Sequence, residues 1–252
     1  LATDGNVIAS TEDNLLIRAR AAGQPLKAIG VMMQYSGIGW TTLRSSGIRA
    51  VADLAGKRVG VHGDGVTALQ IAVRRAGLAP DAVEVIEIGF DYRELLTSGH
   101  LDAVQCLVMV EPLELEDQGL TLHTLAAYQW GYEAYAQVLA TTDRLIAAQP
   151  ETLARFLRVT FDGWRLALAH PHKVARLISE HYLPGSKAEL QARMILAMRP
   201  IIEGKVGAAR MGWMEPNRWE QSIEQLTPGH VHRPMRPEEV MTNALLEQNL
   251  NP

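Results

Sequence analysis

The chain has 252 residues, a formal net charge of −4 and 47% hydrophobic residues, which is enough apolar material for one large domain or two smaller ones. Its charges are mixed and mildly acidic, without the basic stripe of nucleic-acid binders, so we expect no nucleic-acid partner. The single cysteine, Cys106, excludes an intramolecular disulfide and a cysteine-based zinc site.

The first half of the chain repeats a strand–turn–helix pattern. An apolar run at residues 6–9 precedes Ser10, Thr11 and two acidic residues, and this is the signature of a helix N-cap before the helical pattern of residues 13–22. Further strands are predicted at 26–33, 57–61, 83–88 and 103–110, with helices at 67–76 and 91–98. Strands that alternate with helices predict a parallel or mixed α/β sheet.

After about Thr141 the periodicity becomes helical. Helices are predicted at 150–169, 173–181 and 187–198, around Trp219, and from Pro237 onward. No stretch approaches eighteen uninterrupted apolar residues, so we predict no membrane span. The chain shows no signal peptide and opens as if in the middle of a fold, so we expect residues upstream of it.

The turn at residues 62–67 is the first candidate site. His62, Gly63, Asp64 and Thr67 lie where a predicted strand passes into a helix. Glycines leave amide N–H groups pointing outward and the helix N-terminus adds partial positive charge, so the turn suits a carboxylate, sulfonate, phosphate or carbonyl oxygen. An ordinary turn capped by Asp64 or Thr67 explains the same residues equally well.

Other candidates follow the remaining predicted strands. Ser10 and Thr11 occupy the equivalent place in the first unit, and ligands of open α/β sheets bind at the carboxyl ends of strands. Gln34 and Tyr35 follow the strand at 26–33 and are candidates too. Glu111 follows the apolar run at 103–110, and its carboxylate can accept from a ring N–H or an amine, or cap the next helix.

An aromatic segment at residues 128–135 supplies three more candidates, Trp130, Tyr132 and Tyr135. These rings suit stacking on a flat solute or closing a cleft, and they suit an aromatic core segment equally well. The histidines form no pattern of metal ligands, and no serine nucleophile elbow occurs. We therefore predict no metal, no cofactor and no catalytic residue.

Several phrases of the sequence, taken in order, resemble one family. Residues 46–61 carry Ser-Gly-Ile and then Asp-Leu-Ala-Gly-Lys-Arg-Val-Gly-Val, 101–104 carry Leu-Asp-Ala-Val, and 150–171 carry Pro-Glu-Thr-Leu, Arg-Phe-Leu, Gly-Trp and Ala-His-Pro. Trp219 and Met241-Thr242-Asn243 add to them. Together they resemble substrate-binding proteins of ABC importers of the nitrate, sulfonate, taurine and thiamine-pyrimidine-precursor type, which include a pyrimidine synthase-like domain.

The resemblance implies a two-lobed Venus flytrap fold of the periplasmic-binding-protein class, type II-like, with C-terminal helices packed on lobe one. Lobe one would hold residues 1–46 and 142–252, without the family's first strand–helix–strand, and lobe two residues 47–141. A ligand would be buried between the lobes. Glu111-Pro112 resembles an Asn-Glu-Pro element of the thiamine-pyrimidine and riboflavin-like branches, although Val110 replaces the asparagine. Tyr132 and Tyr135 resemble another phrase of those branches, which favours a flat nitrogen heterocycle.

The function that the resemblance implies is solute capture for an ABC permease, in the periplasm or outside the cell, by a monomer that is soluble or membrane-anchored. The ligand would be a small heteroaromatic or anionic compound. An alternative is the ligand-sensing input domain of a membrane receptor kinase or cyclase. A pyrimidine-synthase-like enzyme is the weaker third hypothesis, because this chain lacks that enzyme's cysteine-rich motif. We therefore expect a binding protein and not an enzyme.

Overall fold

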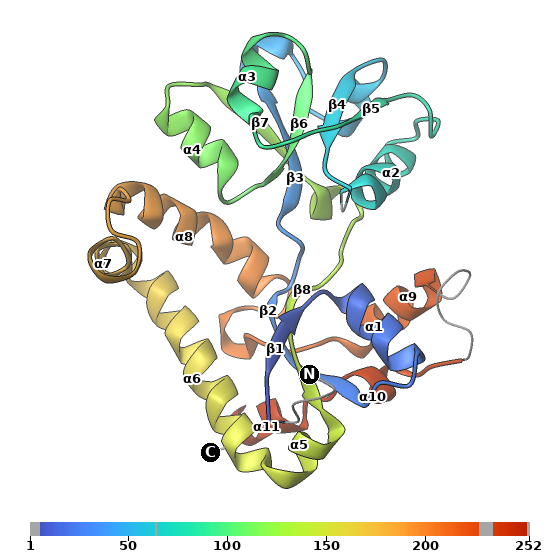
Figure 1. Cartoon of the computed structure of the whole chain (residues 1–252), viewed down its shortest axis with the longest axis vertical. Helices are drawn as coiled ribbons and strands as arrows, with labels where there is room; N and C mark the ends of the chain where they lie inside the picture. The colour runs from blue at the N-terminus through green and yellow to red at the C-terminus, as the bar shows by residue number, and fades with distance from the viewer. Residues whose placement is uncertain (1–5, 64, 227–233, 251–252) are drawn as a thin grey trace. The chain divides into compact units, whose positions relative to one another are not determined.

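The computed structural model of the chain describes residues 6–63, 65–226 and 234–250. Its contacts divide the chain into two compact units. Unit 1 comprises Tyr35 and the residues before it, Ala134–Ala169, and the residues from Arg199 onward, and unit 2 comprises Ser36–Glu133 and His170–Met198. Each unit is built on its own sheet (Figure 1). The predicted α/β class is therefore confirmed.

The sheet of unit 1 has three strands in the order β1 (Ala9–Thr11), β8 (Ala136–Thr142) and β2 (Leu26–Met33). β8 is antiparallel to both neighbours, so β1 and β2 run in the same direction. The outer edge of β2 is paired at one point, because the backbone N–H of Thr242 donates to the carbonyl of Ala28 at 2.9 Å. This pairing covers part of the edge.

Helices α1 (Asp13–Ala21) and α9 (Pro216–Leu226) close the core of unit 1. Each helix contributes apolar residues to the core, the neighbours Leu16 and Ile17 from α1, and Trp219 and Ile223, four residues apart, from α9. They pack against the sheet in one buried cluster. The remaining helices of the unit are α5 (Asp143–Ala148), α6 (Pro150–Ala169), α10 (Pro237–Val240), α11 (Ala244–Leu250) and the 3-10 helix η5 (Ala208–Arg210).

The sheet of unit 2 has five strands in the order β5 (Glu84–Glu87), β4 (Arg58–Val61), β6 (Ala103–Leu107), β3 (Ile38–Leu43) and β7 (Leu122–Ala126). β4 is parallel to β5 and β6, while β3 is antiparallel to β6 and β7. Four strands therefore share one direction, and their carboxyl ends lie at one edge of the sheet.

Helices cover both faces of this sheet (Figure 1). α2 (Val66–Arg75) buries Leu69 in a cluster with Ala103 of β6, whereas Leu96 of α3 (Tyr92–Thr97) and Leu115 of α4 (Glu111–Asp117) cluster with Val104. Because successive strand residues point to opposite faces, the two clusters lie on opposite sides of β6. Unit 2 is thus a layered α/β structure with two apolar cores.

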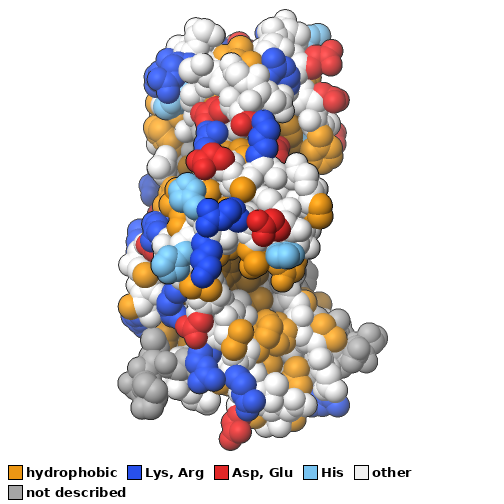
Figure 2. Space-filling model, turned by 90° about the vertical axis from the view of Figure 1, so that its left-hand side faces the viewer, with side chains coloured by type: hydrophobic (Ala, Val, Ile, Leu, Met, Phe, Trp, Pro, Cys, Tyr) orange, Lys and Arg blue, Asp and Glu red, His pale blue; other side chains and the backbone are white. Residues whose placement is uncertain are grey.

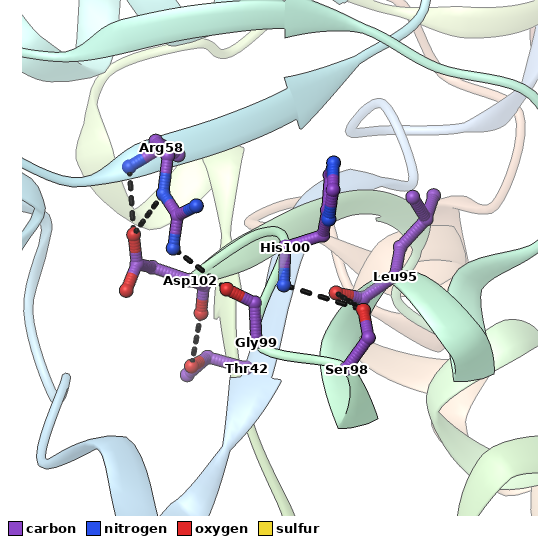
Figure 3. Close-up of polar contacts among 7 residues, drawn as sticks. All are labelled: Thr42, Arg58, Leu95, Ser98, Gly99, His100 and Asp102. Atoms are coloured by element: carbon purple, nitrogen blue, oxygen red, sulfur yellow. Dashed lines mark hydrogen bonds and ion pairs between the residues drawn. The ribbon is translucent and has the colours of Figure 1, made fainter.

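Asp102, from one of the family-like phrases, joins three segments at the edge where β6 begins (Figure 3). Its carboxylate accepts from the backbone N–H of Arg58 at 2.9 Å, and the Arg58 guanidinium lies 3.5 Å from the same oxygen and also donates to the carbonyl of Gly99. The Thr42 hydroxyl donates to the Asp102 carbonyl at 2.7 Å. This phrase therefore has a structural role, because it fixes the starts of β4 and β6 together.

The predicted C-terminal helices do not all belong with unit 1. α7 (Pro171–Leu177), the π-helix η4 (Ile178–Tyr182) and most of α8 (Ala188–Glu203) group with unit 2. Lys187, just before α8, and Arg193 within it pair with Asp117 and Glu116 of α4, at 2.6 and 2.5 Å. Such surface pairs stabilise little, but they join this part of the chain to α4 within unit 2.

The division of the chain differs from the predicted lobes in a second place. The prediction placed residues 36–46 in lobe one, whereas β3 hydrogen-bonds to β6 and β7 in the sheet of unit 2. The predicted strand at 103–110 is also too long, because β6 ends at Leu107. The structure adds β3, β7, β8, α5 and the 3-10 helices η1 (Arg44–Ser46), η2 (Val51–Leu54) and η3 (Ala127–Trp130) to the predicted elements.

The surface of the described residues is mixed in character. Figure 2 shows one face on which Lys and Arg side chains alternate with Asp, Glu and His and with hydrophobic groups. Among the helices of the described part of the chain, none combines the length and apolarity that crossing a bilayer requires.

Candidate functional site

The carboxyl-terminal edge of the unit 2 sheet carries the first group of candidate residues. His62 follows β4, Phe90 follows β5 by a short turn, and Glu111 follows β6 and begins α4. Because these strands run in the same direction, their ends bring residues distant in sequence to one edge, where open α/β sheets bind ligands.

Three aromatic rings meet at this edge. The Phe90 ring stacks on the His62 imidazole with centroids 4.9 Å apart, and Tyr92 lies edge-on to both. The Tyr92 hydroxyl and His62 Nε2 are hydrogen-bonded at 2.9 Å. Phe90 is nonetheless 80% exposed. An exposed ring held by stacking from behind presents a free π-face to a flat solute.

Gln105 fixes the turn that carries His62. Its side-chain Oε1 accepts from the His62 backbone N–H at 2.9 Å. A Cβ on Gly65 would lie 1.8 Å from that oxygen, so a larger residue there would displace the Gln105 side chain from this hydrogen bond. Gly63 has open space around it, and Thr67 lies in the first turn of α2. Asp64 lies outside the described residues, so ligand contact through this turn stays a prediction.

Glu111 closes the turn between β6 and α4, since its Oε2 accepts from the backbone N–H of Leu107 at 2.7 Å. It also lines a pocket of about 630 Å³. The pocket walls combine the Phe90 and Tyr92 rings with Arg93 and with four carboxylates, Asp91, Glu94, Glu111 and Glu114. Such a site suits a flat ring that carries N–H donors or positive charge.

Cys106, the single cysteine, is buried in β6 close to this edge. Burial raises the pKa of its thiol well above the ordinary value, and the charge of Glu111 raises it further. The thiolate is the nucleophilic form of cysteine, so this thiol is a poor nucleophile at neutral pH. Within the described ranges, no group of three or more His, Cys, Asp or Glu side chains is arranged to hold a metal ion.

Trp130 and Tyr132 follow β7 at the same edge of the sheet. Both are partly buried and pack against the apolar cluster beneath α2, and the N–H of Tyr132 donates to the carbonyl of Ala127. Gly131 between them adopts a φ of 96°, which favours glycine. The structure thus gives these rings a packing role, and their contact with a ligand stays a prediction.

The second group of candidates lies on unit 1, where β1 and β2 end and β8 begins. Gln34, Tyr35 and Tyr135 are all buried here. Arg218 of α9 joins them: its Nη2 donates to the Gln34 backbone carbonyl at 2.5 Å, and its guanidinium lies 3.7 Å from the centre of the Tyr135 ring. A guanidinium stacked on tyrosine rings suits planar or anionic groups.

The carboxylate of Asp13 interacts electrostatically with the Arg218 guanidinium, and Asp13 is only 4% exposed. Its Oδ2 accepts from the Tyr135 backbone N–H at 3.2 Å and from the Ser222 hydroxyl at 3.1 Å. Burial raises the pKa of this carboxyl, although those bonds, the N–H of Asn14 and the charge of Arg218 oppose the shift. Burial likewise raises the pKa of the Tyr135 phenol.

We expect Asp13→Asn to change how stability depends on pH. A carboxyl whose pKa is raised on folding keeps its proton in the folded state after the unfolded state has lost it, above a pH of about 3.9. Raising the pH from the pKa of the unfolded state to the higher pKa of the folded state therefore lowers the unfolding free energy of the native protein. The unfolding free energy of the Asn variant does not fall for this reason, because asparagine does not titrate. Urea unfolding at several pH values should show the native protein losing stability relative to Asp13→Asn as pH rises, and an opposite trend would refute the assignment.

Ser10 and Thr11 lie on β1 beside the start of β8. The Ser10 hydroxyl donates to Gln137 Oε1 at 2.7 Å, and Thr11 pairs with Val138. Gln137 has a φ of 54°, an unusual value for a residue other than glycine, and such strained residues gather at functional sites. The structure thus groups the predicted residues of unit 1 at one edge and adds Gln137.

Sequence reasoning missed several residues that these two groups depend on, among them Phe90, Arg218 and Gln137. Phe90 carried a usable signal, since an aromatic pair with Tyr92 directly follows a predicted strand. Arg218 and Gln137 carried none, because an arginine on a helix and a glutamine in a strand are ordinary residues whose role depends on tertiary placement.

Two known proteins are similar to this chain in sequence. The riboflavin-binding protein RibY of Chloroflexus aurantiacus is 25% identical over 249 residues, which cover 96% of this chain and 70% of RibY. The 4-amino-5-hydroxymethyl-2-methylpyrimidine phosphate synthase of Legionella pneumophila is 25% identical over 170 residues, which cover 65% of this chain and about half, 53%, of that enzyme. One relative is thus a binding protein and one an enzyme.

A solved structure extends the likeness to the fold. The periplasmic aliphatic sulphonate binding protein SsuA of Escherichia coli superposes with a TM-score of 0.72 at 17% identity, over 95% of this chain and 76% of that one. The fold is therefore that of periplasmic solute-binding proteins, as predicted. The model of the NMT1/THI5-like family matches residues 1–174. The chain accordingly belongs to the NMT1/THI5-like family.

Proposed function

We propose that this protein is the solute-binding component of an ABC importer and captures a small, flat heteroaromatic compound. The observation that carries the proposal is the exposed Phe90 ring, stacked on His62 beside a pocket lined with carboxylates. Aromatic stacking with few placed polar groups is how proteins bind such rings. The likeness to RibY supports the ligand class, and the likeness to SsuA supports the binding role.

On unit 2 we expect Phe90, His62 and Glu111 to contact the solute, because they offer a π-face, an imidazole and a carboxylate. Unit 1 by itself carries a second candidate, Arg218 beside Tyr35, whose guanidinium suits an anionic group. We further propose that the protein acts as a monomer in the periplasm or outside the cell and delivers its solute to a permease.

Isothermal titration with three probes tests the proposal: riboflavin, 4-amino-5-hydroxymethyl-2-methylpyrimidine and a short alkanesulfonate. We expect one of the two ring compounds to bind with a Kd of about 10 μM or below, and the sulfonate to bind less tightly. Millimolar binding by all three, about −4 kcal/mol, would contradict solute capture. Tighter binding of the sulfonate would retain the binding role and refute the heteroaromatic class.

An enzyme is the second candidate, because the Legionella relative is a synthase. The buried thiol of Cys106, with its raised pKa, argues against cysteine-based chemistry at this edge. Mass spectrometry of each probe after incubation with the protein separates the two functions. A binding protein returns the probe unchanged, whereas conversion of the probe would establish an enzyme.

A further inference from the structure

A second pocket lies within unit 1, and none of the residues that line it is among the candidates at the two sheet edges. One face of α6 lines it, together with the segment at residues 210–213 and Leu246 of α11. Its volume of about 140 Å³ is about ten times the smallest space that holds one water molecule. The pocket therefore has room for a small ligand.

The floor of this pocket is apolar and firmly packed. Phe161, Met211 and Leu246 line it and are all buried. Gly212 approaches the Phe161 ring so closely that a Cβ would lie 2.2 Å from it, and its φ of 90° also favours glycine. The chain thus passes tightly over the Phe161 ring, which fixes the floor in place. A ring or a short aliphatic group would complement this surface.

The walls of the pocket are strongly basic. Three arginines line it, Arg158, Arg165 and Arg210, against one carboxylate, Asp162. Asp162 already pairs with Arg165 at 2.8 Å, and Arg165 also donates to the carbonyl of Ala208. Arg158 and Arg210 form no ion pair with any residue that the structure describes. Two guanidinium charges beside an apolar floor therefore lack a counter-charge among the described residues.

The Arg210 side chain is ordered by stacking on an aromatic ring. Its guanidinium carbon lies 3.9 Å from the centre of the Trp213 ring, and both residues line the pocket. Stacking on an indole orders the planar fork of arginine, so that less freedom is lost when it binds a carboxylate with two parallel hydrogen bonds. An arginine ordered in this way suits recognition of a planar anion.

We propose that this pocket binds a small organic carboxylate whose apolar part rests on the Phe161 floor and whose charge faces Arg158 and Arg210. The anion would supply the counter-charge that the described residues do not, and the ring or chain would cover the apolar floor. This site is separate from the residues that we expect to contact the transported solute, and it does not depend on the proposed function.

Three probes test separately the apolar ring and the negative charge that the proposed ligand combines. Benzoate carries a ring and a charge, benzamide carries the ring without the charge, and acetate carries the charge without the ring. We expect benzoate to bind at least tenfold more tightly than either of the others in isothermal titration. In ¹H–¹⁵N NMR spectra the Trp213 indole signal should shift on addition of benzoate, while that of Trp130 in unit 2 should not.

Matched variants then locate the site. Arg158→Gln combined with Arg210→Gln should weaken benzoate binding at least tenfold, and both side chains are exposed, so folding should be unaffected. Arg155→Gln is the control, because Arg155 is exposed on the same helix but does not line the pocket. No benzoate binding up to 10 mM, equal binding of benzamide, or unchanged binding by the double variant would overturn the proposal. Loss of benzoate binding in Phe90→Ala would assign benzoate to the transported-solute site instead.

Discussion

Replacing Phe90 by alanine is expected to weaken binding of the ring compound, with riboflavin as the probe, by about 5- to 140-fold. Removal of an aromatic platform beneath a heteroaromatic ring costs about 1–3 kcal/mol, and each 1.4 kcal/mol is a factor of ten in affinity. The Phe90 ring has His62 behind it and is 80% exposed, so its truncation leaves little cavity. The melting temperature should therefore stay the same while the affinity falls.

Two further variants test whether the loss of affinity is specific to the Phe90 ring. Phe156→Ala removes a partly exposed phenylalanine from α6 in unit 1, so it controls for the loss of an exposed ring in general. Phe90→Trp keeps an aromatic platform and should retain most of the affinity. Equal affinity of Phe90→Ala and the native protein for the ring compound would remove Phe90 from the binding site and with it the central observation behind the proposed function.

The largest loss of stability is expected from Trp219→Ala, at about 3–5 kcal/mol. The Trp219 side chain is fully buried, and its ring lies 5.8 Å from that of Tyr135, on which the Arg218 guanidinium stacks. Its truncation would leave a cavity at the centre of the unit 1 core, directly behind the candidate residues. Urea unfolding followed by circular dichroism measures the loss.

Trp219→Phe is the matched control for this cavity. The Trp219 indole N–H is buried and has no hydrogen-bond partner among the described residues, so phenylalanine removes an unsatisfied donor while keeping a ring in place. It should be clearly more stable than the alanine variant. A loss below about 1 kcal/mol for Trp219→Ala would show that the unit 1 core does not depend on this ring.

The sequence predicted the elements that carry their own local signals. The strands near 26–33 and 57–61 and the helix near 67–76 have apolar periodicity bounded by glycine or proline, and the structure places them within a residue of the prediction. β3 escaped prediction, because Gly39, Thr41 and Thr42 interrupt its apolar pattern, yet all three are buried between β6 and β7. Only the tertiary pairing shows that these small and polar residues form a central strand.

The candidate site was predictable to a similar degree. The position of residues after strands indicated His62, Glu111 and Gln34. The structure places His62 and Gln34 directly after strands and Glu111 at the start of the helix that follows β6. The local sequence could not tell residues that contact a ligand from residues that hold other side chains in place. It therefore did not show that Tyr135 is buried and that the Arg218 guanidinium stacks on its ring. The guanidinium comes from a helix more than 80 residues later in the chain.

The way the segments of each unit are distributed along the chain has a consequence for biosynthesis. All five strands of unit 2 have been made once residue 126 leaves the ribosome, whereas the core of unit 1 awaits Trp219 and Val240. Domains fold as units during synthesis, and early strands remain exposed until their partners arrive. β2 is therefore synthesised before the strands of unit 2, whereas the Trp219 and Val240 side chains that share its apolar core follow only after both sheets have been made.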